Sequence, residues 1–514
     1  MKEHLKNSFS TGVSLTPQTA NPTPLTPHHS PHTPHPTPLL LSAFCFLLFL
    51  LTPFSSLAQG GEWGPLTWKI EDETLFISGN GDMPDEGGSS PWYFWGSFNA
   101  VVIEHGVTSI RSFAFSYCQS FHSITIPNSV TKIGEYAFDH SNSLTSITIP
   151  PGVTKIEKNT FYYCESLTSI TIPGNVKSIG KQAFNYCTSL ESVTIQEGVN
   201  SIGVEAFSDC KNLTTVSIPN SVKTIEKGAF SYCEKLQNIT LPDELENIED
   251  VVFCQCKNLI SINIPNSVTS IGENAFWACE KLASIDIPDN VKEIKYCAFQ
   301  SCNSLVSVII PKSVTSLGSV VFGGCEKLTS IDIQGNITII NERTFSNCYK
   351  LENVTIPSSV AAIKEKAFEM CGSLSTIICY RPTPPAVAIN SFLGVYTGAC
   401  TLKVPESSVI FYQNALIWQD FYIEGMGVGI EPITNDELRI TVYPNPTTGE
   451  LRIENGELTI NNVEIYDVYG RKQFSIFNCQ FSIEKIDISH LSNGIYFLRI
   501  ETETGTITKK IIKQ

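Results

Sequence analysis

The sequence predicts a solenoid of short parallel β-strands, one per repeat, joined by tight helical or 3₁₀ turns and followed by a small β-sandwich. Three observations lead to this fold class. A phenylalanine recurs every 23 residues from Phe115 to Phe368, without insertion or deletion. Hydrophobic residues make up 42% of the chain and charged residues 16%, so there is ample apolar surface to bury. The final segment, 438–514, lacks the repeat and contains several short alternating runs typical of a sandwich.

The N-terminus has the features of an export signal. Residues 39–51, LLLSAFCFLLFLL, have the length of a signal-peptide hydrophobic region and are too short to span a bilayer comfortably. Ser56-Leu57-Ala58 supplies small residues for cleavage, so we expect 1–58 to be removed between Ala58 and Gln59. Residues 1–38 are rich in Thr, Pro and His, and either form an unusually long leader or reflect a mis-assigned start codon. No other run approaches membrane-spanning length, which predicts no transmembrane segment in the mature chain.

Each repeat reads A-F-x-x-C-x-x-L-x-x-I-x-I-P-x-x-V-x-x-I. The S-I-T-I part, for example Ser146 to Ile149, alternates polar and β-branched apolar residues and predicts a half-buried strand. The A-F-x-x-C part is too brief for a long helix and predicts a tight turn. One unit cannot bury its own apolar face, so neighbouring units must stack and form continuous internal columns.

Cysteine follows the phenylalanine by three residues in eleven of the twelve copies, and Ser141 replaces it in the other. A disulfide framework, a metal site, a redox site and a buried small apolar column are the alternatives. Structural zinc requires closely paired ligands, whereas these cysteines are 23 residues apart. A uniform ladder also offers no reason for one disulfide pairing over another. We therefore expect a reduced core column, with no metal and no cofactor.

This repeat resembles the BspA-like bacterial leucine-rich-repeat family. The resemblance covers about 105–379 and implies a leucine-rich-repeat solenoid on a surface-displayed or secreted protein, often one involved in adhesion. Residues 59–104 resemble the family's N-terminal cap, and 380–424 resemble a C-terminal cap. Such caps are needed because an open solenoid end exposes apolar columns and unpaired strand edges. A glycine-bearing stretch at 425–437 is expected to be a linker.

Residues 438–514 carry the strings V-Y-P-N-P-T-T-G-E-L, I-Y-D-V-Y-G-R, L-S-N-G-I-Y-F-L-R-I and T-K-K-I-I-K. Together they resemble the C-terminal sorting domain of the type IX secretion system. The resemblance implies handling by the type IX secretion machinery, with the protein secreted or attached to the outer-membrane surface of a Gram-negative bacterium. An ordinary β-sandwich binding domain is the alternative. The residues that match the sorting motif are Tyr443, Pro444, Asn445, Pro446, Gly449, Lys509 and Lys510.

Two sets of outward-facing residues are candidates for ligand binding. The first is a ribbon of hydroxyl side chains on the strands, and its alternative interpretation is a solvated sheet face with good β-propensity. It includes Ser146, Thr148, Ser169, Thr171, Ser192 and Thr194. The second is a row of tyrosines two residues after the phenylalanine, for which partial burial of each ring against its neighbour is the alternative. It comprises Tyr117, Tyr163, Tyr186 and Tyr232, all in the N-terminal half.

Composition and motifs argue against other functions. The formal net charge of −16 is unfavourable for a nucleic-acid partner. The chain contains no H-E-x-x-H, no G-x-S-x-G and no phosphate-binding glycine loop, which predicts that it is not an enzyme. We expect an exported scaffold that binds an extracellular protein or glycan. The alternatives are a structural surface component without a dedicated ligand and an enzyme with its site in the caps.

Overall fold

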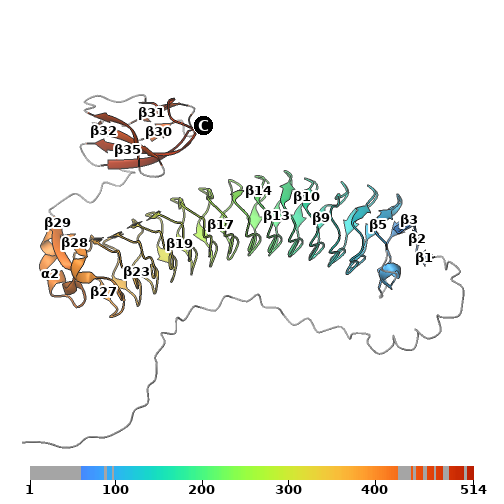
Figure 1. The fold of residues 1–514 in the computed structure, drawn as a ribbon, viewed down its shortest axis with the longest axis horizontal. Coiled ribbons are helices and arrows are strands. Elements are labelled where there is room, and N and C mark those ends of the chain that lie inside the picture. Colours follow the sequence, from blue (N-terminus) through green and yellow to red (C-terminus); the bar gives the residue numbers. More distant parts are fainter. Residues whose placement is uncertain are drawn as a thin grey trace, which may run out of the picture. The chain divides into compact units, whose positions relative to one another are not determined.

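The computed structural model describes residues 59–85, 89–94, 98–426, 441–443, 447, 449–454, 460–467, 471–477, 486–502 and 506–513. The predicted signal peptide and Ala58 lie outside the described residues, as do Pro444, Asn445 and Pro446 of the predicted sorting signal. The repeats form the coils of a parallel β-solenoid (Figure 1), and the C-terminal segment forms antiparallel sheets. The predicted fold class is confirmed.

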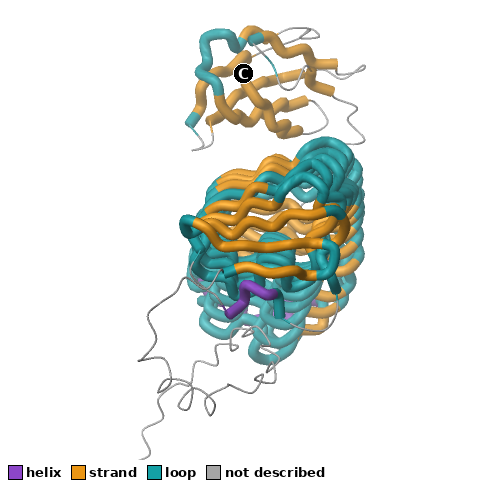
Figure 2. The backbone as a smooth tube through the Cα atoms, turned by 90° about the vertical axis from the view of Figure 1, so that its right-hand side faces the viewer, coloured by secondary structure: helices purple, strands orange, loops and turns teal. Residues whose placement is uncertain are grey.

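Each 23-residue coil contributes strands to two sides of the solenoid. The S-I-T-I segments give the first series, and the V-x-x-I segments give a second series of mostly two-residue strands. Figure 2 shows the strands of successive coils one behind another. The first series consists of β5 (Ala100–Ile103), β7 (Ser123–Thr125), β10 (Ser169–Ile172), β12 (Ser192–Ile195), β14 (Thr215–Ser217), β16 (Asn238–Thr240), β20 (Ser307–Ile310), β22 (Ser330–Ile333), β24 (Asn353–Ile356) and β26 (Thr376–Cys379). The second consists of β6 (Val107–Ile110), β8 (Lys132–Ile133), β9 (Lys155–Ile156), β11 (Ser178–Ile179), β13 (Ser201–Ile202), β15 (Thr224–Ile225), β17 (Asn247–Ile248), β18 (Ser270–Ile271), β19 (Glu293–Ile294), β21 (Ser316–Leu317), β23 (Ile339–Ile340), β25 (Ala362–Ile363) and β27 (Ala386–Val387).

The strands pair in parallel and in a register of one whole repeat, so that Ser169 lies beside Ser192. The first series is interrupted in three coils, although their side chains still alternate between exposed and buried. Residues 146–149, expected to form a strand, pair only through a bridge between Ser123 and Ser146. Residues 261–264 and 284–287 form no strand. Beside these last two coils, β17, β18, β19 and β21 pair without a break, so the coils stay joined through the second series.

The A-F-x-x-C segments form the third side of each coil. Their tight turns contain 3₁₀-type bonds, such as Tyr162 N–H to the Asn159 carbonyl at 3.2 Å. These turns do not continue as a helix, because the residues two before and two after each phenylalanine have positive φ in every repeat. The alternate amides instead donate to the next coil, as Phe161 N–H does to the Ala183 carbonyl at 2.8 Å. The turn side is therefore a second kind of inter-coil ladder.

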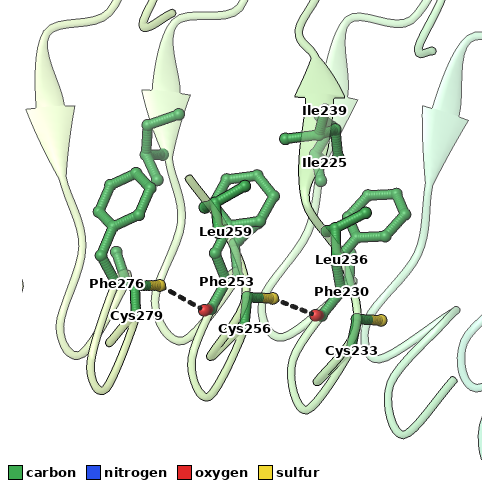
Figure 3. Packing of buried hydrophobic residues seen from close by; sticks show 14 of the residues in the cluster. Ile225, Phe230, Cys233, Leu236, Ile239, Phe253, Cys256, Leu259, Phe276 and Cys279 are labelled. Atoms are coloured by element: carbon green, nitrogen blue, oxygen red, sulfur yellow. Dashed lines mark hydrogen bonds between the residues drawn. The ribbon is translucent and has the colours of Figure 1, made fainter. Parts of the chain in front are cut away.

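The core is a set of columns that run through the coils. Successive phenylalanine rings stack with centroids 5.0 to 6.2 Å apart. Each buried cysteine three residues after a repeat phenylalanine donates its thiol to the carbonyl of the phenylalanine 26 residues earlier, as in Cys256 to Phe230 at 3.2 Å (Figure 3). Ser141 donates to the Phe115 carbonyl in the same way, at 2.9 Å. The thiol column thus satisfies a carbonyl group at each coil, in addition to filling space.

Caps close both ends of the columns. The N-terminal cap has antiparallel strands β1 (Gly60–Trp63), β2 (Leu66–Glu71) and β3 (Thr74–Gly79), the two-residue β4 (Gly81–Asp82) and helix η1 (Pro91–Phe94). Trp92 of η1 stacks on Phe115, with centroids 5.5 Å apart. The C-terminal cap has η2 (Thr397–Ala399), β28 (Thr401–Pro405), η3 (Glu406–Ser408), α2 (Val409–Gln413), η4 (Trp418–Asp420) and β29 (Tyr422–Met426). Phe392 stacks on Phe368, and Trp418 packs edge-on against Phe392. The first two residues of the predicted linker belong to β29.

The C-terminal module contains a three-stranded and a four-stranded sheet, both antiparallel. Its buried residues include Leu451, Val463, Ile465, Leu498 and Ile500. The first sheet has β30 (Thr441–Tyr443), β31 (Glu450–Glu454) and β34 (Ile486–Asp487), and the second has β33 (Lys472–Phe477), β32 (Ile460–Asp467), β35 (Gly494–Thr502) and β36 (Thr506–Lys513).

The phenylalanine column predicts a large stability effect of truncating one ring. Phe207 is completely buried, and Phe207→Ala should lower the free energy of unfolding by about 3–5 kcal/mol, from lost burial and the cavity left behind. Urea unfolding followed by circular dichroism measures this. The control is Met370→Ala, whose side chain is 47% exposed and whose loss should change stability by less than about 0.5 kcal/mol. Equal effects of the two substitutions would contradict the column's role.

The thiol column predicts unusually inert cysteines. All fifteen described cysteines are free, and Cys118 alone among them is not buried. Burial raises the pKa of thiols such as Cys325, to about 12, so the reactive thiolate is scarce at neutral pH. In a mature chain carrying Cys479→Ser, a thiol-reactive dye should label no more than Cys118 in the native state and all fifteen in urea. Fast native labelling that survives Cys118→Ala would contradict this prediction.

Candidate functional site

The tyrosine row lies on the turn side of the solenoid. Tyr117, Tyr163 and Tyr186 occupy the same place in their coils, and His140 occupies it in the coil between the first two. The four rings form one continuous stack, with centroid separations of 4.4, 4.6 and 4.4 Å and planes within 6 to 10° of parallel. We call these four residues the aromatic stack.

The backbone of the turns fixes the geometry of the aromatic stack. Each member has a positive φ of 55 to 60°, which turns its side chain out of the turn in the same direction in every coil. Each also donates its N–H to the following coil, as Tyr163 does to the Asn185 carbonyl at 2.9 Å. The rings therefore repeat at the spacing of the coils, which is close to the separation of stacked aromatic pairs.

Two members of this site were missed by the sequence analysis. His140 was left out of the predicted row, although it stands two residues after Phe138 and so belongs to it. Tyr162 follows Phe161 directly and packs edge-on against Tyr163, with centroids 4.6 Å apart. Counting positions within the 23-residue period would have found His140. Nothing in the period indicates that Tyr162 turns toward the stack.

A buried carboxylate holds His140 in place. Nδ1 of His140 lies 2.6 Å from Oδ1 of Asp139, and Ser116 donates its hydroxyl to Oδ2 of the same carboxylate at 3.3 Å. Asp139 is only 6% exposed. The aromatic stack therefore contains an imidazole between two phenol rings, with a carboxylate bonded to its edge.

The fourth predicted tyrosine, Tyr232, is separated from the aromatic stack. Asp209 takes the place of a ring in the intervening coil, with the same left-handed backbone at φ 58°. Burial raises the pKa of the Asp209 carboxyl, while Lys211 and the Ser208 hydroxyl counteract this shift. Lys211 is a distant partner, with Nζ 3.9 Å from Oδ1. The structure thus brings three of the four predicted tyrosines together and places the last beyond a carboxylate.

The aromatic stack is both partly covered and accessible. The side chain of Tyr117 is 54% exposed, and the other three members are half-buried. Burial raises the pKa of Tyr186 and of Tyr232 to about 12. Their phenols therefore remain protonated at neutral pH and can donate hydrogen bonds. The stack presents ring edges and hydroxyl groups to solvent, while most ring faces are covered by neighbouring rings.

The hydroxyl ribbon lies on the first series of strands. Ser169 and Thr171 pair with Ser192 and Thr194, and all four side chains are exposed. Ser146 and Thr148 are also exposed, at the coil where the ladder is interrupted. A hollow of about 420 Å³ opens there, and it is lined by Ser146, Ile147, Thr148, Ile149, Ser169, Ile170, Thr171 and Pro173. The ribbon is thus continuous as a surface, although its backbone pairing is not.

The described residues of the predicted sorting signal lie in the C-terminal module. Tyr443 ends β30 and pairs with Arg452, and Lys509 and Lys510 lie in β36 opposite Leu498 and Phe497. Gly449 has a φ of 153°, and a Cβ atom there would stand 3.1 Å from Cα and Cβ of Ser489. A side chain at this position would therefore be both strained and crowded.

Among the described residues, no group of three or more His, Cys, Asp or Glu is arranged to hold a metal ion. Within the same part of the chain, no helix is long and apolar enough to cross a membrane.

Comparison with known families identifies both parts of the chain. The BspA type leucine rich repeat region matches over residues 89–214, 177–305 and 271–383. The secretion system C-terminal sorting domain matches over residues 441–514. This domain assigns the chain to handling by the type IX secretion machinery and indicates a secreted or surface-attached protein. A search of curated proteins finds no significant match.

One solved structure agrees with the family match. A leucine-rich repeat protein from Bacteroides ovatus is 30% identical, with a TM-score of 0.54 over 71% of this chain and 98% of that protein. A leucine-rich cell surface protein from Faecalibacterium prausnitzii is 26% identical, with a TM-score of 0.39 over 74% of this chain and 96% of that protein. With more than half of its length matched by the repeat family, the chain belongs to the BspA-type leucine-rich repeat proteins, and it carries a C-terminal sorting domain.

Proposed function

We propose that this protein is an adhesin-like scaffold, which binds an extracellular protein or glycan through the aromatic stack after delivery by the sorting domain. The observation that carries the proposal is that aromatic rings occupy the position two residues after the phenylalanine in the N-terminal half of the solenoid alone. In later coils the same position carries Gln255, Ala278, Ser301, Gly324 and Asn347, although the backbone there is unchanged. The fold therefore does not require rings at this position.

The aromatic stack is suited to binding for an energetic reason. An isolated tyrosine on a surface loses side-chain freedom when a partner fixes it, and this loss opposes association. In the aromatic stack each inner ring is already held between two others, at 4.4 to 4.6 Å. These rings have already lost their side-chain freedom during folding. Contacts to their edges and phenol hydroxyls are therefore opposed by a smaller loss of entropy on binding and contribute more to affinity.

The hydroxyl ribbon supports a second contact for the same partner. Its exposed Ser and Thr side chains offer both donors and acceptors, which suits glycan hydroxyls as well as protein backbone. The hollow between residues 146–149 and β10 supplies a local concavity on this surface. A structural surface component without a dedicated ligand would need neither the aromatic stack nor a hollow, and this alternative is an outcome of the binding test.

Replacing the stacked tyrosines should abolish partner binding without unfolding the solenoid. The variant combines Tyr117→Ser, Tyr163→Asn and Tyr186→Asn, because Ser301 and Asn347 already occupy equivalent positions with φ of 59 and 58°. Adhesion of the mature protein to host matrix proteins, glycan arrays and whole cells should fall by about tenfold or more, as expected for the loss of central aromatic contacts. Thermal unfolding monitors the fold.

The matched control is Met370→Asn, at the same position in the last complete coil. It should leave adhesion unchanged. Equal binding of the tyrosine variant and the unaltered protein would refute a role for the aromatic stack. Failure of the unaltered protein to bind any discrete, saturable partner would instead favour the structural alternative.

Removal of the sorting domain should stop export at the outer membrane. A chain that ends after residue 440 lacks all strands of the C-terminal module, from β30 to β36. In a bacterium with the type IX machinery, it should accumulate in the periplasm, while the full chain reaches the surface or the medium. Cell fractionation and protease accessibility on intact cells measure this. Surface exposure of the truncated chain at the normal level would contradict the proposed delivery route.

A further inference from the structure

Within the aromatic stack, an imidazole ring lies between two phenol rings. His140 lies between Tyr117 and Tyr163, with centroids 4.4 and 4.6 Å away. Its Nδ1 contacts the Asp139 carboxylate at 2.6 Å. The arrangement is a planar nitrogen heterocycle, stacked on both faces by tyrosine and hydrogen-bonded at its edge to an acid.

Three coils further along, two tyrosines again flank a position of the column, and that position carries no ring. Tyr186 and Tyr232 occupy the column on either side of Asp209, and the short aspartate side chain replaces a ring. Ring centroids in adjacent coils of this column are 4.4 to 4.6 Å apart, so two steps span about 9 Å. A planar group midway between the two coils would lie about 4.5 Å from each ring, which is within the range of cation–π attraction. We call Tyr186, Asp209 and Tyr232 the Asp209 notch.

The electrostatics of the Asp209 notch favour a positive ligand. The side chain of Asp209 is 13% exposed, and its polar contacts are the Ser208 hydroxyl at 3.3 Å and the Lys211 ammonium at 3.9 Å. The second distance is too long for a hydrogen bond. Glu205 and Glu234 lie close enough to disfavour the ionised form of Asp209 further. A poorly compensated carboxylate, flanked by aromatic rings and further acids, is complementary to an incoming cation.

We propose that the Asp209 notch binds the guanidinium group of an arginine side chain on the protein partner. The inference rests on the proposed function, and it narrows the partner to a protein with an exposed arginine. Arginine fits better than lysine because its guanidinium is planar, stacks on aromatic faces and donates a fork of hydrogen bonds that a carboxylate can accept. The two tyrosines would contact the guanidinium as Tyr117 and Tyr163 contact His140, and Asp209 would supply a carboxylate from the column position itself, where Asp139 does so from the preceding residue. Lys211 is half-exposed and competes for the same carboxylate.

The direct test uses N-acetyl-L-arginine amide as a probe for the intact mature protein. Ligand-observed nuclear magnetic resonance should show saturable, millimolar binding, with N-acetyl-norleucine amide as the uncharged comparison. Asp209→Asn preserves the shape of the side chain and suits the left-handed backbone. It should lower the affinity for the probe about tenfold or more, because the negative charge that pairs with the guanidinium is lost. Tyr232→Ser should weaken binding to a similar degree, whereas Tyr232→Phe should keep most of it, because the ring face remains.

Two further variants distinguish binding at the Asp209 notch from a general effect of surface charge on the affinity for the probe. Lys211→Gln removes the competing ammonium and should raise the affinity for the probe by about threefold. If the probe bound at another site, this substitution would leave its affinity unchanged. Asp332→Asn removes a carboxylate from the sheet surface, far along the chain from any tyrosine of the row, and should leave the probe's affinity unchanged. Circular dichroism confirms that each variant folds.

The proposal is overturned if the probe does not saturate, if norleucine amide binds as well, or if Asp209→Asn binds like the unaltered protein. The adhesion assays of the aromatic-stack variant are read separately. Saturable arginine binding that depends on Asp209, combined with undiminished adhesion of that variant, would leave the notch in place and refute the stack's role in adhesion. Loss of adhesion in that variant, combined with no saturable arginine binding by the unaltered protein, would support the stack's role in adhesion and refute the Asp209 notch.

Discussion

The structure depends on backbone hydrogen bonds between coils that are separated by one whole repeat. On the strands they are ordinary parallel ladders, and on the turns they link alternate amides, such as Phe161 N–H, to the next coil. Both kinds of bond join residues 22 to 24 positions apart in the repeats, so a constant period keeps every side of the coil in register. The constancy of the period from Phe115 to Phe368 follows from this constraint.

Register of this kind converts each position of the repeat into a column of stacked side chains. A phenylalanine column becomes a continuous aromatic core, and a cysteine column becomes a line of thiols that donate to carbonyl groups (Figure 3). The thiols are protected chemically as well as sterically, because burial raises the pKa of groups such as Cys325 and Cys371 to about 12. Disulfide exchange requires the thiolate. An exported protein can therefore carry many cysteines within one core.

The same register makes the outward columns a simple means of varying a surface without altering the fold. The position two residues after the phenylalanine has one backbone conformation, yet it carries Tyr, His, Asp, Gln, Ala, Ser, Gly, Asn and Met in different coils. The left-handed backbone tolerates this range because the inter-coil hydrogen bonds hold it in place. Binding properties then arise from local runs, such as the aromatic stack, and from breaks in those runs, such as Asp209. The net negative charge of the whole chain is consistent with a cationic contact on the partner.

The sequence alone was sufficient to predict the solenoid, its repeat and the identity of the core columns, because a strict period reports directly on which residues stack. It also identified the sorting domain, because that module's motifs are contiguous. The tertiary structure decided three features that no period encodes. It interrupted the ladder at 146–149, 261–264 and 284–287, where the alternation of exposed and buried side chains is unchanged. It turned Tyr162 edge-on against Tyr163, and it brought the rings two residues after the phenylalanines to stacking distance. These contacts depend on the direction in which each turn residue projects. That direction is set by the positive φ, which the packing of neighbouring coils imposes on residues that would rarely adopt it by themselves.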